Sequence, residues 1–199
     1  MKRFLKAAVA ATVLAWGSAS ALAANLSFTG NLGGDNDVQL FSFSLTSTAD
    51  VTLRTWSYAG GSNAAGAAIG AGGFDAVVAL FSGTGGAALL INGNDDGFGV
   101  AVDPGTGFAY DALLEAFALS AGDYTVALTN FANFANGPTL DDGFLDAGEA
   151  GFNGRTSAWA LDILGADAAS PIPESGTLAL AGLGLCVAAL ARRRAVATA

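Results

Sequence analysis

The sequence predicts an all-β domain, an antiparallel β-sandwich of about eight strands, placed between two terminal targeting segments. About eight short runs alternate apolar and polar residues, which is the period-2 pattern of strands with one buried face. Gly, Asp, Asn or Ser separates these runs, as expected of turns. No long helix pattern alternates with the runs, so an antiparallel sandwich is favoured over a parallel α/β sheet.

The predicted strands follow one another at short intervals. In the clearest of them, residues 38–46, the apolar residues Phe41, Phe43 and Leu45 alternate with hydroxyl residues. Residues 112–118 (ALLEAFA) also have the composition of a helix, which competes with the strand interpretation there. The full set of predicted strands is 26–29, 38–46, 51–59, 74–82, 87–91, 109–119, 124–131 and 157–164.

Two long segments interrupt the strand pattern. Residues 60–73 are rich in Gly and Ala and are interpreted as a flexible surface loop. Residues 133–154 form a long acidic loop, and loops of that length are usually functional or mobile. Its acidic cluster is interpreted as a solvated surface and consists of Asp141, Asp142, Asp146 and Glu149.

The N-terminus has the pattern of a secretory signal peptide. A basic start, residues 2–6, precedes an apolar segment, 7–15, and the small-residue motif A-L-A. We expect cleavage after Ala23, with Ala21 and Ala24 as alternatives. The rest of the chain is then exported.

The C-terminus has the pattern of a membrane anchor. An apolar segment, 177–191, is shorter than the ~20 residues that span a bilayer comfortably. Arg192, Arg193 and Arg194 follow it and would lie on the cytoplasmic side, where their long side chains extend the effective span. A core helix is the alternative interpretation. The predicted organisation is a signal peptide (1–23), a β-sandwich domain (24–165), a linker with a sorting motif (166–174), and a transmembrane helix with a basic tail (175–199).

This tail resembles the PEP-CTERM sorting signal of Gram-negative bacteria. In that signal a V-P-E-P-type motif precedes an apolar helix and an Arg cluster; here Ile172, Pro173 and Glu174 match the motif, and Ser175 replaces its second proline. The resemblance implies transient anchoring in the inner membrane and processing by an exosortase near Pro173 and Glu174. It also implies delivery to the cell surface or to an exopolysaccharide matrix.

The domain itself resembles the bacterial pre-peptidase C-terminal (PPC-like) β-sandwich. The matches are an A-G-x-Y-x-V motif at 121–126, an entry strand at 37–43, and further residues at Asp75, Leu80, Phe81, Leu89, Leu90, Asn94, Asp95 and Asp96. Ala76 replaces the proline that usually follows the first aspartate. The resemblance implies a jelly-roll-like, non-catalytic module that binds carbohydrate or protein, in some members with calcium.

Charge and composition exclude several classes of function. Between residues 24 and 170, sixteen acidic residues face only two basic ones, Arg54 and Arg155, so the domain carries a net charge of −14. Such a charge argues against nucleic acid as a partner. The chain has no histidine, and its one cysteine, Cys186, lies in the predicted tail, so imidazole- and thiol-dependent sites are excluded. We therefore expect that the protein is not an enzyme.

One loop has the spacing of a calcium site. Asn92, Asn94 and Asp96 occupy alternate positions before a glycine, and Asp103 lies seven residues beyond Asp96. Because the flanks are predicted strands, an EF-hand is not expected, and an ordinary polar turn is the main alternative. The candidate ligands of Ca²⁺ are Asp75, Asn92, Asn94, Asp95, Asp96 and Asp103, with Asp35 and Asp37 as more distant candidates.

The expected function is that of an exported, non-enzymatic surface or exopolysaccharide-matrix protein. The first alternative is a calcium-dependent carbohydrate-binding module, which exposed aromatic residues beside Asp95 and Asp96 would favour. The second is a secreted hydrolase, which needs two carboxylates across a cleft, although no pair is marked by an apolar setting. The aromatic residues that could stack on sugars or belong to the core are Trp56, Tyr58, Phe131 and Trp159.

Overall fold

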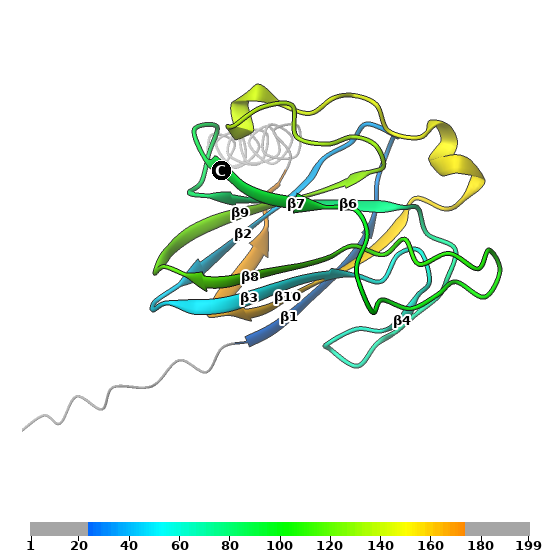
Figure 1. Cartoon of the computed structure of the whole chain (residues 1–199), viewed down its shortest axis with the longest axis horizontal. Coiled ribbons are helices and arrows are strands. Elements are labelled where there is room, and N and C mark those ends of the chain that lie inside the picture. The colour runs from blue at the N-terminus through cyan, green and yellow to red at the C-terminus, as the bar shows by residue number, and fades with distance from the viewer. Residues whose placement is uncertain (1–23, 174–199) are drawn as a thin grey trace, which may run out of the picture.

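The computed structural model describes residues 24–173, which form two antiparallel sheets packed face to face (Figure 1). The four-stranded sheet has the order β1 (Ala24–Asn31), β10 (Ala158–Ala166), β3 (Ala49–Thr55) and β8 (Leu113–Leu119). The five-stranded sheet has the order β11 (Ala168–Pro171), β2 (Gln39–Leu45), β9 (Gly122–Asn130), β6 (Ala76–Ser82) and β7 (Leu89–Asn94). The prediction of an all-β, antiparallel fold is confirmed.

One hydrophobic core joins the two sheets. The inward side chains of β2, namely Phe41, Phe43 and Leu45, are buried, as their alternation predicts. From the opposite sheet, Trp159 meets Phe41 edge to face with ring centroids 5.6 Å apart. Burying a Leu or Phe side chain stabilises by about 1.5–3 kcal/mol, so this shared core is the main force that holds the sheets together.

All eight predicted strands are present, and residues 113–119 are strand β8 rather than helix. The predicted linker, residues 166–174, belongs to the folded domain in the part that the structure describes. Strand β10 continues to Ala166, and β11 pairs with β2 in the second sheet. Ile172 then donates its backbone N–H to the carbonyl of Leu40 at 2.8 Å. The domain therefore extends past residue 165, because the free edge of β2 accepts a further strand whose composition carries no strand signal.

The Gly/Ala-rich segment 60–73 is fastened to the first sheet. It contains a short hairpin, β4 (Gly61–Ser62) with β5 (Ala68–Ile69). The buried carboxylate of Asp162 accepts hydrogen bonds from the Ala64 backbone N–H (2.9 Å), Trp56 Nε1 (2.7 Å) and Ser27 Oγ (2.5 Å). We call residues 60–73 the hairpin flap.

The acidic loop 133–154 is also held in place. It includes two short 3₁₀ turns, η1 (Leu140–Asp142) and η2 (Ala150–Gly154). Asp35 accepts the backbone N–H groups of Gly151 and Phe152, and Asn36 accepts that of Gly148. Asp35 thus anchors the second turn.

Several sequence predictions fall outside the described residues. These are the signal peptide with its cleavage site at Ala23, the transmembrane segment 175–199, and the sorting residues Glu174, Arg192, Arg193 and Arg194. Within residues 24–173, no helix has the length and apolarity needed to cross a membrane.

Candidate functional site

The candidate site lies where loops converge at one end of the two sheets. Strand direction brings the ends of β7 and β9 next to the start of β6, since Asn94 pairs with Val78 and Asn130 with Ala76. The segments after β3 and before β8 close the same end. Together they form a pocket of about 400 Å³, which we call the acidic pocket; its lining residues are Tyr58, Asp75, Asp95, Asp96, Phe108, Tyr110, Phe131, Glu149 and Asn153.

Asp75 is the most perturbed residue of the acidic pocket. It directly precedes β6, and its Oδ1 atom is buried without a hydrogen-bond partner. Burial, as the largest cause, and then the nearby carboxyl groups of Asp96, Asp95 and Glu149 together raise the pKa of Asp75 to about 8. Asp75 is therefore mostly protonated at neutral pH, a property that no sequence pattern marks.

Asp95 and Asp96 enter the acidic pocket from the turn after β7. The Asp95 backbone N–H donates to Asn94 Oδ1 (3.1 Å), and the Asp96 N–H donates to Asp95 Oδ1 (3.0 Å). Asn94 in turn donates its Nδ2 to the carbonyl of Leu113 (2.8 Å), which joins this turn to the first residue of β8. Desolvation, and then Asp95, raise the pKa of Asp96.

Three aromatic rings form one wall of the acidic pocket. Phe108 stacks on Tyr110 with ring centroids 5.0 Å apart and an interplanar angle of 4°. Tyr110 meets Tyr58 edge to face at 5.1 Å. Phe108 remains 52% exposed, so its ring offers a free apolar face. Phe131 contributes a fourth ring from the segment after β9.

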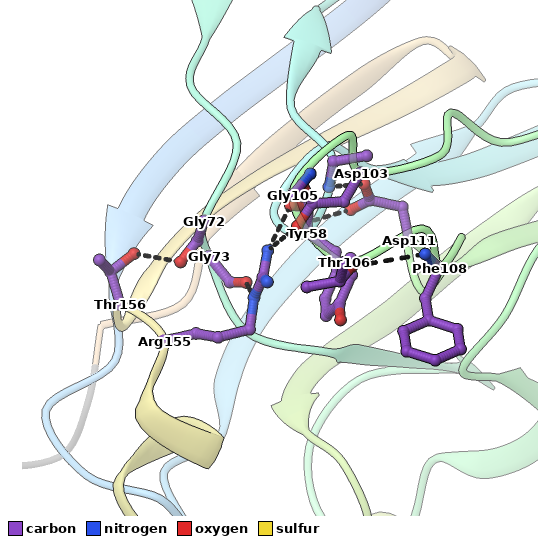
Figure 2. Close-up of polar contacts among 11 residues, drawn as sticks. Tyr58, Gly72, Gly73, Asp103, Gly105, Thr106, Phe108, Asp111, Arg155 and Thr156 are labelled. Carbon is purple, nitrogen blue, oxygen red and sulfur yellow. Dashed lines mark hydrogen bonds and ion pairs between the residues drawn. The ribbon is translucent and has the colours of Figure 1, made fainter.

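Arg155 contacts Tyr58, one ring of this aromatic wall (Figure 2). Its Nε donates to the carbonyl of Gly73 (2.5 Å), and its Nη2 donates to the carbonyl of Tyr58 (2.6 Å). Nη2 also forms an ion pair with Asp103 Oδ2 at 2.7 Å. Asp111, buried beneath, accepts the backbone N–H groups of Tyr58 and Ala59. These contacts fix the position of Tyr58.

The six predicted Ca²⁺ ligands do not form one group. Asp75, Asp95 and Asp96 line the acidic pocket, whereas Asn92, Asn94 and Asp103 do not. Asn92 Oδ1 accepts the N–H of the next residue. Asp103 accepts a hydrogen bond from the backbone N–H of Gly105 and forms an ion pair with Arg155, and both contacts lower its pKa. Within the described part of the chain, no three His, Cys, Asp or Glu side chains are arranged to hold a metal ion.

Sequence reasoning missed much of the pocket. Glu149, interpreted as part of a solvated cluster, lines it because Asn130 Nδ2 and Phe131 hold its backbone, at 3.0 Å and 2.6 Å. Phe108 and Tyr110 carry no motif; the only signal is that they are aromatic residues in a Gly-rich loop. Of the candidate stacking residues, Trp159 and Tyr58 are buried and Phe131 lines the pocket.

Comparisons with known proteins add no assignment to this geometry. No protein-family model matches the sequence, and no curated protein is similar enough to count as a relative.

Proposed function

We propose that this chain is an exported, non-enzymatic surface or exopolysaccharide-matrix protein that binds carbohydrate in the acidic pocket. The observation that carries the proposal is the pairing of a partly exposed aromatic wall, Phe108 on Tyr110, with the carboxylates of Asp75, Asp95 and Asp96 in one cavity. Aromatic rings stack on the C–H face of a sugar, and carboxylates accept hydrogen bonds from its hydroxyl groups. A cavity of this size takes one or two sugar rings.

The strand order supports the jelly-roll-like topology that the PPC-like resemblance implies. Apart from the small hairpin β4–β5, which belongs to neither sheet, and the hairpin β6–β7, consecutive strands alternate between the two sheets. The first strand pairs with β10, which lies beside β3. Jelly rolls arrange two antiparallel sheets in this way and serve as lectin domains in many proteins. The fold by itself does not specify a ligand, so the proposal rests on the pocket.

The two chain ends supply the proposed location. The signal peptide would deliver the domain across the inner membrane, and the PEP-CTERM-like tail would hold it there until an exosortase processes it near Pro173 and Glu174. Strand β11 ends at Pro171, so the proposed processing site follows the folded domain within a few residues. Fractionation of cells that produce the full chain tests this location: the domain should leave the membrane only when the processing enzyme is present.

A secreted hydrolase is the second candidate, and Asp75 favours it. A carboxylic acid that stays protonated at neutral pH beside a second carboxyl group is the arrangement of a glycosidase general acid. Because Asp75 Oδ1 is buried, its other oxygen would have to deliver the proton. Release of reducing ends from a bound polysaccharide, lost in Asp75→Asn, would establish this activity in place of simple binding.

The binding proposal is tested with the mature exported protein on a polysaccharide array, with and without calcium. We expect retention of at least one polysaccharide without release of reducing ends. Phe108→Ala should lose this retention, because the exposed stacking ring is removed. Phe117→Ala is the matched control, since Phe117 is 70% exposed on β8 but does not line the acidic pocket. Equal retention by both variants would contradict the proposal.

A further inference from the structure

We infer that the ligand of the acidic pocket carries a positively charged ammonium group beside an apolar ring face, as an amino sugar of a polysaccharide does. This inference rests on the proposed function and names its substrate class. It depends on three features of the pocket: its uncompensated negative charge, its several carboxyl acceptors and its aromatic wall.

The negative charge of the pocket has no partner within the domain. Four acidic side chains line the cavity, and no basic side chain does. Of the two basic residues between 24 and 173, Arg155 is bound to Asp103. Arg54 stacks over Trp56 at 3.8 Å, on the first sheet. A cationic ligand therefore supplies the compensating charge that the fold leaves out.

The cavity presents several carboxyl acceptors to a ligand. Oδ1 of Asp75 is enclosed, so the other oxygen of Asp75 and the carboxyl groups of Asp95 and Asp96 are the acceptors that line the cavity. An ammonium group offers three N–H donors and a positive charge, whereas a sugar hydroxyl offers one donor and no charge. An ammonium group therefore suits a cavity with several carboxyl acceptors better than a hydroxyl group does.

The aromatic wall favours an organic cation over a metal ion. Phe108, Tyr110 and Tyr58 present ring faces and edges, and a cation over such a face is attracted by the ring quadrupole. Calcium instead needs six to eight oxygen ligands, and the carboxylates here are not arranged as a metal-binding group. The sugar ring to which the ammonium group is attached would stack on the exposed face of Phe108.

Calorimetric titration of the mature exported protein at pH 7 tests the inference with three probes: a glucosamine trimer, an N-acetylglucosamine trimer and trilysine. Acetylation removes the charge but keeps the ring, and trilysine keeps the charge but lacks the ring. We expect the glucosamine trimer to bind at least tenfold more tightly than either of the others. Addition of 1 mM calcium should leave its affinity unchanged.

Two substitutions locate the binding. Asp75→Asn should weaken binding of the glucosamine trimer at least tenfold. It should also reduce the difference in affinity between the glucosamine trimer and the acetylated trimer. Asp123→Asn should leave both affinities unchanged, because Asp123 is an exposed carboxylate outside the pocket. If the control variant weakens binding equally, the attraction is that of bulk charge and the inference is wrong. Phe108→Leu, which keeps an apolar side chain, should weaken binding without unfolding the protein.

The outcomes separate this inference from the proposed function. If the acetylated trimer binds as tightly as glucosamine, the ammonium group is refuted while carbohydrate binding stands. If trilysine binds as tightly and depends on Asp75, the ligand is a basic peptide and the amino sugar is refuted. Loss of glucosamine binding in 1 mM calcium would show that the pocket prefers the metal ion, and the inference would be wrong. If no sugar binds, the proposed function fails as well.

Discussion

Arg155 lies over the ring of Tyr58, with its guanidinium carbon 3.6 Å from the ring centroid. Tyr58 lines the acidic pocket, whereas Arg155 does not. Through Gly73 and Asp103, the same guanidinium also joins the end of the hairpin flap to the loop that carries Phe108 (Figure 2). The nearest basic side chain thus builds the wall of an acidic cavity without neutralising it.

Arg155→Lys should therefore both destabilise the domain and weaken ligand binding. An ammonium group cannot reproduce the contact of the guanidinium with the Tyr58 ring or its several fixed donors, and we expect the free energy of unfolding in urea to fall by about 1–2 kcal/mol. Arg54→Lys is the matched control. It removes a similar stack over Trp56 but should leave affinity in the pocket unchanged. Loss of affinity in both variants would refute the positioning role of Arg155.

Asp75 should make the ligand-free protein less stable as the pH rises. Its pKa is about 8 in the folded state and about 4 in the unfolded state, so between these values the folded state holds a proton that the unfolded state has released. Stability consequently falls from about pH 4 through about pH 8. The melting temperature should drop between pH 6 and 8.5 in the wild type and stay flatter in Asp75→Asn. Parallel curves for the two proteins would show that Asp75 titrates elsewhere.

Asp162→Ala should release the hairpin flap. The substitution leaves the N–H groups of Trp56 and Ala64 without their acceptor, at a cost of about 2–4 kcal/mol. Trp56 should become more exposed, which a red shift of tryptophan fluorescence in the folded protein would report. An unchanged emission maximum would mean that the flap stays in place without this carboxylate.

Gly30→Ala should destabilise the edge of the first sheet. A Cβ atom at this position would lie 2.4 Å from the nearest ring atom of Trp159, which packs directly on the glycine. Overpacking of this kind costs about 1–3 kcal/mol. Gly70→Ala serves as the comparison, because a Cβ there would meet no atom within 4 Å. In thermal unfolding, the melting temperature of Gly30→Ala should lie several degrees below that of Gly70→Ala.

Removal of the positive charges near the C-terminus tests the sorting proposal. Replacement of Arg192, Arg193 and Arg194 by Ser should impair membrane retention and sorting, because the cytoplasmic charges that orient the segment are lost. Ser175→Pro should, if anything, improve processing, since it restores the second proline of the PEP-CTERM motif. Wild-type fractionation and maturation of the Arg variant would contradict the sorting proposal.

The sequence predicted those parts of the fold that depend on local pattern. Alternating side chains identify β2 because its two faces have different surroundings. The same reasoning does not identify β11, whose residues 168–171 are strand only because the edge of β2 is free beside them. The hairpin flap likewise depends on Asp162, which is distant in sequence.

Only the aspartates of the pocket were predictable from the sequence. Asp75, Asp95 and Asp96 belong to recognisable motifs at strand ends, and antiparallel pairing brings such ends together. Phe108 and Tyr110 reach the pocket because the backbone N–H of Asp103 bonds the carbonyl of Phe108 and so closes a turn, which delays the start of β8 to Leu113. No periodic pattern reports such a turn, so the aromatic wall could be found only from the structure.

The pairing of β1 with β10 also has a consequence for the order in which the domain matures. The first strand of the domain completes its hydrogen bonds with one of the last, so the fold has a high contact order and the first sheet cannot close before residues 158–166 are available. Ala24, the residue after the expected cleavage point, is already part of β1. If the chain is exported as proposed, the domain should therefore remain loose until residues 158–166 have crossed the membrane.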